Sequence, residues 1–199
     1  MQIVPIEWNY TGSADPLCGT GATPAERLLA YGMATLFTGL VLVANFYRDD
    51  PIAEGWSIAL LAFFAFDIIG GAVANMLNSC KRFYHRTLQA GEGRGARLAK
   101  NPTVFTAIHI HPIIAAYVFQ GSVLNAFAWY ILLQISVAVI LALPLYLRRA
   151  AATAITVLAL LGSQLILPLG AGLEWFIPCL YIKMVLGHAV QEEPYRAEN

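Results

Sequence analysis

The chain has 199 residues, of which 58% are hydrophobic and 12% are charged, and its formal net charge is +0. Soluble domains carry about 25% charged residues, so this composition excludes an ordinary soluble protein. The sequence also lacks the basic excess typical of nucleic-acid-binding domains, and we expect membrane lipids and no nucleic acid as partners.

Six apolar segments have roughly the length that a membrane-spanning helix needs, which is ~20 residues for ~30 Å of hydrocarbon. They cover residues 24–46, 54–77, 103–121, 125–147, 150–168 and 173–190. We therefore predict an all-α, polytopic transmembrane helix bundle with about six spanning helices. A single helical domain over residues 23–190 would follow a polar N-terminal arm (1–22) and precede a short C-terminal tail (191–199).

The basic residues are distributed unevenly along the chain. Six of the twelve lie in the connection after the second segment, between Lys81 and Lys100, and Arg148 and Arg149 are expected in the turn after the fourth segment. The first connection, from Arg48 to Glu54, is mostly acidic. Basic loops stay on the cytoplasmic side, so we expect both termini to be cytoplasmic in a multi-pass protein, in the inner membrane if the source is bacterial.

The first segment begins with Thr23-Pro24-Ala25-Glu26. This is the sequence of a capping box, in which a threonine and a glutamate bond to each other's backbone amides, with proline at the first helical position. We therefore predict that the first helix begins at this point.

The second segment contains Asp67 among large apolar residues. A charge at the centre of a bilayer costs at least roughly 2.5–3.5 kcal/mol, so we interpret Asp67 as a functional residue, with a protonated structural carboxyl as the alternative. On a helix that continues past residue 77, several polar or small residues share its face, and this stripe predicts a cleft that runs to the cytosol. The stripe comprises Asp67, Gly71, Asn78, Lys81 and His85, with Asn75 beside it.

Between the second and third segments, Gly91-Glu-Gly-Arg-Gly-Ala-Arg97 predicts a flexible loop. The third segment then contains Ile108-His-Ile-His-Pro112. His109 and His111 would point about 200° apart on a regular helix, but Pro112 favours a kink that brings both rings inward. The alternative is a pair of neutral histidines bonded to backbone groups that the kink exposes.

The fourth and fifth segments are almost wholly apolar, and we interpret them as scaffold. In the sixth, Glu174, Tyr181, His188 and Glu192 fall on one face of a helix that Pro178 is expected to bend. Lys183 has two interpretations, either as an anchor to lipid headgroups or as the partner of Asp67.

Together these residues predict a polar pocket open to the cytosolic side, in an intramembrane hydrolase or group transferase that acts on a lipid or another amphipathic substrate. The predicted catalytic residues, which are also candidate ligands for zinc or iron, are Asp67, His109, His111 and His188. The predicted lining residues are Gly71, Asn75, Asn78, His85, Tyr181, Lys183 and Glu192.

Three other functions remain open on sequence alone. A small proton-coupled transporter would use the same acid and imidazoles as a proton relay. Haem could be held between His188 and either His109 or His111, although the sequence favours this less. An accessory membrane subunit without chemistry is the third alternative.

Overall fold

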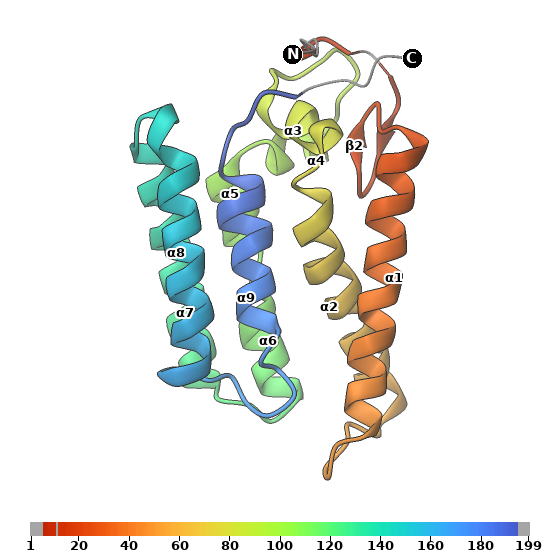
Figure 1. The fold of residues 1–199 in the computed structure, drawn as a ribbon, viewed down its shortest axis with the longest axis vertical. Helices are drawn as coiled ribbons and strands as arrows, with labels where there is room; N and C mark the ends of the chain where they lie inside the picture. Colours follow the sequence, from red (N-terminus) through yellow and green to blue (C-terminus); the bar gives the residue numbers. More distant parts are fainter. Residues whose placement is uncertain (1–5, 11, 195–199) are drawn as a thin grey trace, which may run out of the picture.

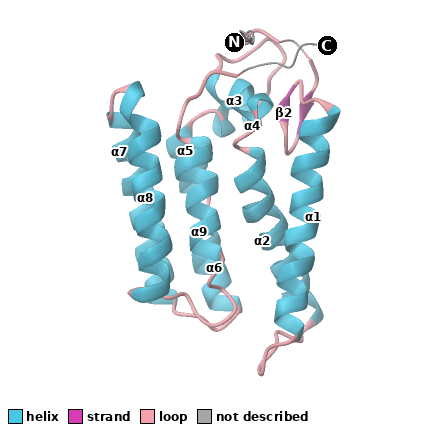
Figure 2. Ribbon diagram, in the orientation of Figure 1, coloured by secondary structure: helices cyan, strands magenta, loops and turns pink. Residues whose placement is uncertain are grey.

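The protein forms an elongated bundle of roughly aligned helices in the computed structural model, which describes residues 6–10 and 12–194 (Figures 1 and 2). The longer helices are α1 (Pro24–Phe46), α2 (Gly55–Ala74), α7 (Val123–Ala142) and α8 (Leu145–Leu165). The shorter elements are β1 (Ala14–Asp15), β2 (Gly19–Thr20), α3 (Asn78–His85), α4 (Arg94–Ala99), α5 (Pro102–Ala107), α6 (His111–Val118), α9 (Phe176–Tyr181) and the π-helix η1 (Ile182–His188).

The four longer helices are long and apolar enough to cross a membrane. Two further apolar stretches, Pro102–Val118 and Phe176–His188, are shorter and irregular within their length. The structure thus confirms a helical, membrane-compatible bundle. The long helices keep much of their apolar surface on the outside, and only 11% of the most apolar part of α1 is buried.

Prolines set several helix boundaries. The break expected near Pro112 is present, because α5 ends at Ala107 and α6 begins at His111. Pro144 directly precedes α8, so Arg148 and Arg149 lie in its first turns and not in a loop between helices as expected. Pro178 sits in the first turn of α9, where its missing N–H costs no helical hydrogen bond, and the irregular stretch follows it as η1.

Two predictions about the connection after α2 were wrong. The second helix does not continue as one rod to His85, because it ends at Ala74 and α3 starts again at Asn78 after a turn. The side chain of Asn75 donates to the carbonyl of Lys183 (3.0 Å), which fixes the chain at the break. Within the predicted flexible loop, Arg94–Ala99 form the short helix α4.

The basic residues of α3 bind the segment before α1. Arg82 is buried and donates to the carbonyls of Glu7 (2.8 Å) and Thr20 (2.7 Å), and Arg86 donates to the carbonyl of Tyr10 (2.6 Å). Carbonyls without a partner in a sheet or helix need such donors when they are buried. The described part of the N-terminal arm is therefore packed against α3.

The start of α1 confirms the predicted capping box. The amide of Glu26 donates to Thr23 Oγ1 (3.2 Å), and the amide of Thr23 donates to Glu26 Oε2 (2.8 Å). The other carboxylate oxygen of Glu26 accepts from the amide of Ser79 (3.3 Å). One glutamate thus joins the start of α1 to the start of α3.

We expect Thr23→Ala to lower the free energy of unfolding by about 1 kcal/mol, because it removes the acceptor for one helix-terminal amide. Glu26→Ala should cost more, since it also frees the amide of Ser79. Thermal unfolding in detergent measures both changes. Thr35→Ala, on the exposed face of the same helix, is the control, and an equal effect of all three substitutions would contradict the capping role.

Candidate functional site

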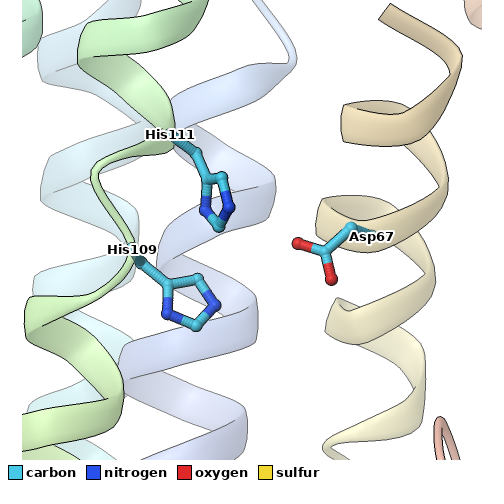
Figure 3. Close-up of side chains that lie close together, drawn as sticks. All are labelled: Asp67, His109 and His111. Carbon is cyan, nitrogen blue, oxygen red and sulfur yellow. The ribbon is translucent and has the colours of Figure 1, made fainter. Parts of the chain in front are cut away.

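A cluster of one carboxylate and two imidazoles lies inside the bundle, where α2 faces the break between α5 and α6 (Figure 3). The nearest nitrogen or oxygen atoms of Asp67, His109 and His111 all lie within 4.8 Å of one another. The two imidazole rings have centroids 4.9 Å apart. The structure therefore brings together three of the four predicted catalytic residues.

The break in the third segment is what places both histidines on one side. Helical bonding is interrupted after Ala107, and the amide of His109 bonds back to the carbonyl of Thr106 (3.0 Å). His111 then opens α6, immediately before Pro112. The turn replaces the opposed directions that a regular helix would give, so the expected inward kink is confirmed.

Asp67 forms an ion pair with Lys183 of η1, with 2.7 Å between Oδ2 and Nζ. The side chain of Lys183 is only 5% exposed, whereas that of Asp67 is 33% exposed. The hypothesis that Lys183 is the partner of Asp67 is confirmed, and the alternative of a headgroup anchor is wrong. A buried ammonium is stable only when it is paired in this way.

Small and polar residues of α2 make room for this lysine. A Cβ atom at Gly71 would lie 2.6 Å from Cε of Lys183, so the aliphatic part of the lysine lies directly across the glycine. Asn75, one turn further on, holds the lysine's own carbonyl. The lysine sits in a π-helix, a rare conformation that is frequent at functional sites.

The hydrogen bonds of the two histidines differ. Nδ1 of His109 lies 2.6 Å from the carbonyl oxygen of Phe105. A carbonyl only accepts, so Nδ1 carries the proton and Nε2 of His109 presents a lone pair. Nδ1 of His111 is buried and, within residues 6–10 and 12–194, has no hydrogen-bond partner.

His188 is not part of this cluster. Its Nε2 lies 3.0 Å from the carbonyl oxygen of Ala99, and its ring stacks on Phe105 at 4.4 Å. Phe105 also contacts His109 (4.6 Å), so one phenyl ring packs against both imidazoles. His85 lies further along, with its ring 6.5 Å from that of His188, and burial lowers the pKa of His85 to about 4.

The other residues that were predicted to line the pocket lie in a separate cleft or in the apolar core. Asn78 and Glu192 line a separate cleft of about 820 Å³, where Glu192 pairs with Arg149 (2.7 Å) and with the buried Lys81 (3.4 Å). Tyr181 is in the apolar core, with its ring 5.6 Å from that of Trp129.

A groove of about 1330 Å³ lies elsewhere in the bundle. Its walls come from α1, α2, α9, η1 and three connecting segments, and they are mainly apolar. None of the three cluster residues lines it. The cluster and this groove are therefore separate features of the bundle.

The cluster combines groups suited to acid–base chemistry. Nε2 of His109 can accept a proton, the Asp67 carboxylate carries negative charge, and the ammonium of Lys183 can stabilise a developing anion. Two imidazoles and a carboxylate are also the donor set of many catalytic metal sites. Comparison with known protein families, curated protein sequences and solved structures gives no match.

The ion pair makes a direct prediction. Lys183→Met leaves the carboxylate without its cation, and Asp67→Asn leaves the ammonium buried without its anion, so each should lower the free energy of unfolding. The double variant should lose less than the sum, with a coupling energy of roughly 1–2 kcal/mol. Thermal unfolding of the four proteins in detergent measures this.

A longer pair with an exposed cation provides the control for that cycle. Arg27 and Asp15 are 3.7 Å apart, and the arginine side chain is 47% exposed, whereas that of the aspartate is 14% exposed. The same cycle with Arg27→Met and Asp15→Asn should give a coupling below about 0.5 kcal/mol. Equal coupling in the two cycles would show that Asp67 and Lys183 do not form a special pair.

Proposed function

We propose that this chain is an intramembrane hydrolase or group transferase that acts on a lipid or another amphipathic substrate at the Asp67–His109–His111 cluster. The observation that carries the proposal is the convergence of two imidazoles on a carboxylate whose cation, Lys183, is almost wholly buried. Scaffold residues rarely include so many polar groups at this depth, because each must be paired or hydrated.

The proposed roles follow from the hydrogen bonds. His109, with its proton fixed on Nδ1, acts as general base through Nε2 and takes a proton from the attacking water or hydroxyl group. Lys183 stabilises the negative charge that develops on the substrate. Asp67 orients Lys183 and keeps it charged.

Entry from the lipid is supported by what surrounds the cluster. Asp67 is one-third exposed, and Phe63, one helical turn before it, is 56% exposed. Ile108 and Ile110, on either side of His109 in the chain, are also exposed. A partly exposed carboxylate near exposed apolar side chains suits a substrate whose hydrocarbon part stays in the bilayer.

We further propose six membrane spans, with Pro102–Val118 and Phe176–His188 as the third and sixth. These stretches would cover about 25 and 20 Å as ideal helices, and turns at their ends add to that length. In this topology α3, α4 and both termini are cytoplasmic, and Asp67 lies about 10 Å from the cytoplasmic end of α2. In a bacterial cell the membrane would be the inner one.

A proton-coupled carrier is the second candidate. It is favoured by the row of rings that runs from His111 through His109, Phe105 and His188 to His85, and that connects the cluster to α3. A haem protein is not favoured by this geometry, because Nε2 of His188 already bonds to a backbone carbonyl.

The enzyme proposal is tested with purified protein in a total lipid extract, followed over time by mass spectrometry. Wild type should form products, and His109→Ala should form them at least about 100-fold more slowly, because it removes the general base. Tyr117→Ala, on the exposed face of α6, is the folded control with unchanged activity.

If wild type and His109→Ala give the same products at the same rate, the enzyme proposal fails. Proton flux into liposomes that depends on Asp67, without any lipid product, would instead establish the carrier.

The topology is tested by labelling single introduced cysteines in intact cells with a reagent that does not cross membranes. Arg94→Cys should react only after permeabilisation, because α4 is on the cytoplasmic side of the proposed topology. Asp50→Cys, in the exposed connection between α1 and α2, should react from outside. The reverse pattern would invert the orientation.

A further inference from the structure

We propose that Asp67, His109 and His111 bind one divalent metal ion of the zinc class, in a site with three protein ligands and an open position. This inference rests on the proposed function, since an open position is what a hydrolase or transferase would use. It names the cofactor of the same site, and with Nε2 of His109 bound to the ion, metal-bound water takes the part of the nucleophile and His109 no longer acts as the general base. Structural zinc sites have four protein ligands, whereas catalytic ones commonly have three.

The donor atoms are of the right kind and nearly at the right spacing. Imidazole nitrogen and carboxylate oxygen suit zinc, and also iron in the arrangement of two histidines and one carboxylate. The three atoms lie within 4.8 Å of one another. Bonds of about 2.0–2.1 Å in a tetrahedron set ligand atoms about 3.3 Å apart, so the three atoms would have to come up to about 1.5 Å closer to bind one ion.

Two hydrogen bonds around the cluster are of the kind that orients the ligands of a metal ion, and we call them outer contacts. A histidine that binds a metal donates its other ring N–H to a carbonyl or carboxylate, and His109 donates Nδ1–H to the carbonyl of Phe105 (2.6 Å). A ligating carboxylate is itself hydrogen-bonded, and Asp67 accepts from Lys183 (2.7 Å). Both ligands are thus held with lone pairs free toward the common centre, on which Figure 3 shows the side chains converging.

His111 supplies an independent observation. Its Nδ1 is buried and lacks a hydrogen-bond partner among the described residues. A buried polar atom without a partner costs about 1–3 kcal/mol. A bond from this nitrogen to a metal would give it a partner and make His111 the third ligand.

The net charge of the metal-loaded site indicates which kind of fourth ligand it needs. A divalent ion added to the Asp67–Lys183 pair gives a net charge of about +2 in a low-dielectric region. An anionic fourth ligand offsets this, either ionised water or a phosphate or carboxylate group of the substrate. The proposal therefore favours an anionic amphipathic substrate, which the ammonium of Lys183 would also attract.

The experiment measures metal and activity separately. Protein purified in detergent is stripped with chelator, loaded with Zn²⁺ or Co²⁺, and analysed for bound metal and for the absorption spectrum of cobalt. Stripped and loaded protein are also compared for product formation in the lipid extract. Wild type should hold about one ion per chain. Asp67→Asn, His109→Ala and His111→Ala should each weaken binding more than about 100-fold, beyond what the loss of an outer contact does.

Two variants serve as controls. His188→Gln removes a buried histidine outside the cluster and should keep the full metal content and cobalt spectrum. Lys183→Met removes an outer contact and also a repelling charge, so it should weaken binding less than about 100-fold, which is less than the loss of a ligand does. Loss of metal from His188→Gln, equal to that from His109→Ala, would overturn the assignment of ligands.

The remaining outcomes separate this inference from the proposed function. Less than about 0.1 ion per chain in reloaded wild type overturns the metal site. Stripped protein that still forms product overturns the metal as the cofactor of the reaction, and leaves the acid–base enzyme in place. One ion per chain on these three ligands, without lipid turnover, establishes the metal site while the enzyme proposal fails.

Discussion

The cost of placing a carboxylate among apolar helices is the constraint on which the site depends. Asp67 remains ionised in such surroundings only if a cation is close, and Lys183 provides it at 2.7 Å. The lysine reaches that position because Gly71 leaves no side chain in its path. Asn75 then ties the backbone of η1 to the end of α2. The ion pair, the missing side chain at Gly71 and the hydrogen bond from Asn75 together fix how α2 packs against η1.

Buried charged side chains also need partners at the end of the bundle where α3 lies. Lys81 is buried and donates to the carbonyls of Gly187, in the last turn of η1, and of Val190, just after η1. Arg82 and Arg86 do the same for residues before α1. Last-turn carbonyls of a helix have no partners of their own, and cations are the favourable donors there. The basic residues that suggested topology thus also hold the chain together.

Local patterns predicted the parts of the fold that local interactions determine. Thr23-Pro24-Ala25-Glu26 predicted the start of α1, and the proline after His111 predicted the break that joins the two imidazoles. The prediction of a continuous polar stripe from Asp67 to His85 was wrong. The helix ends after Ala74, and the turn that follows depends on a hydrogen bond from Asn75 to Lys183, which is 108 positions away in the sequence. The exclusion of His188 from the cluster likewise depends on the carbonyl of Ala99 and on the ring of Phe105. Helical periodicity contains no information about such contacts.

Charge balance links the candidate functions of the cluster. As it stands, the Asp67–Lys183 pair is neutral, and two neutral imidazoles add no charge, so the site is compatible with its apolar surroundings. A proton or a metal ion that enters disturbs this balance and must bring an anion or displace Lys183. In a carrier, the added positive charge would drive a conformational change of the protein. In an enzyme, the same charge would hold an anionic substrate. Because Asp67 is one-third exposed beside apolar side chains, the compensating anion can arrive on a molecule that is itself dissolved in the membrane. This favours chemistry on an amphipathic substrate over transport of a small hydrophilic ion.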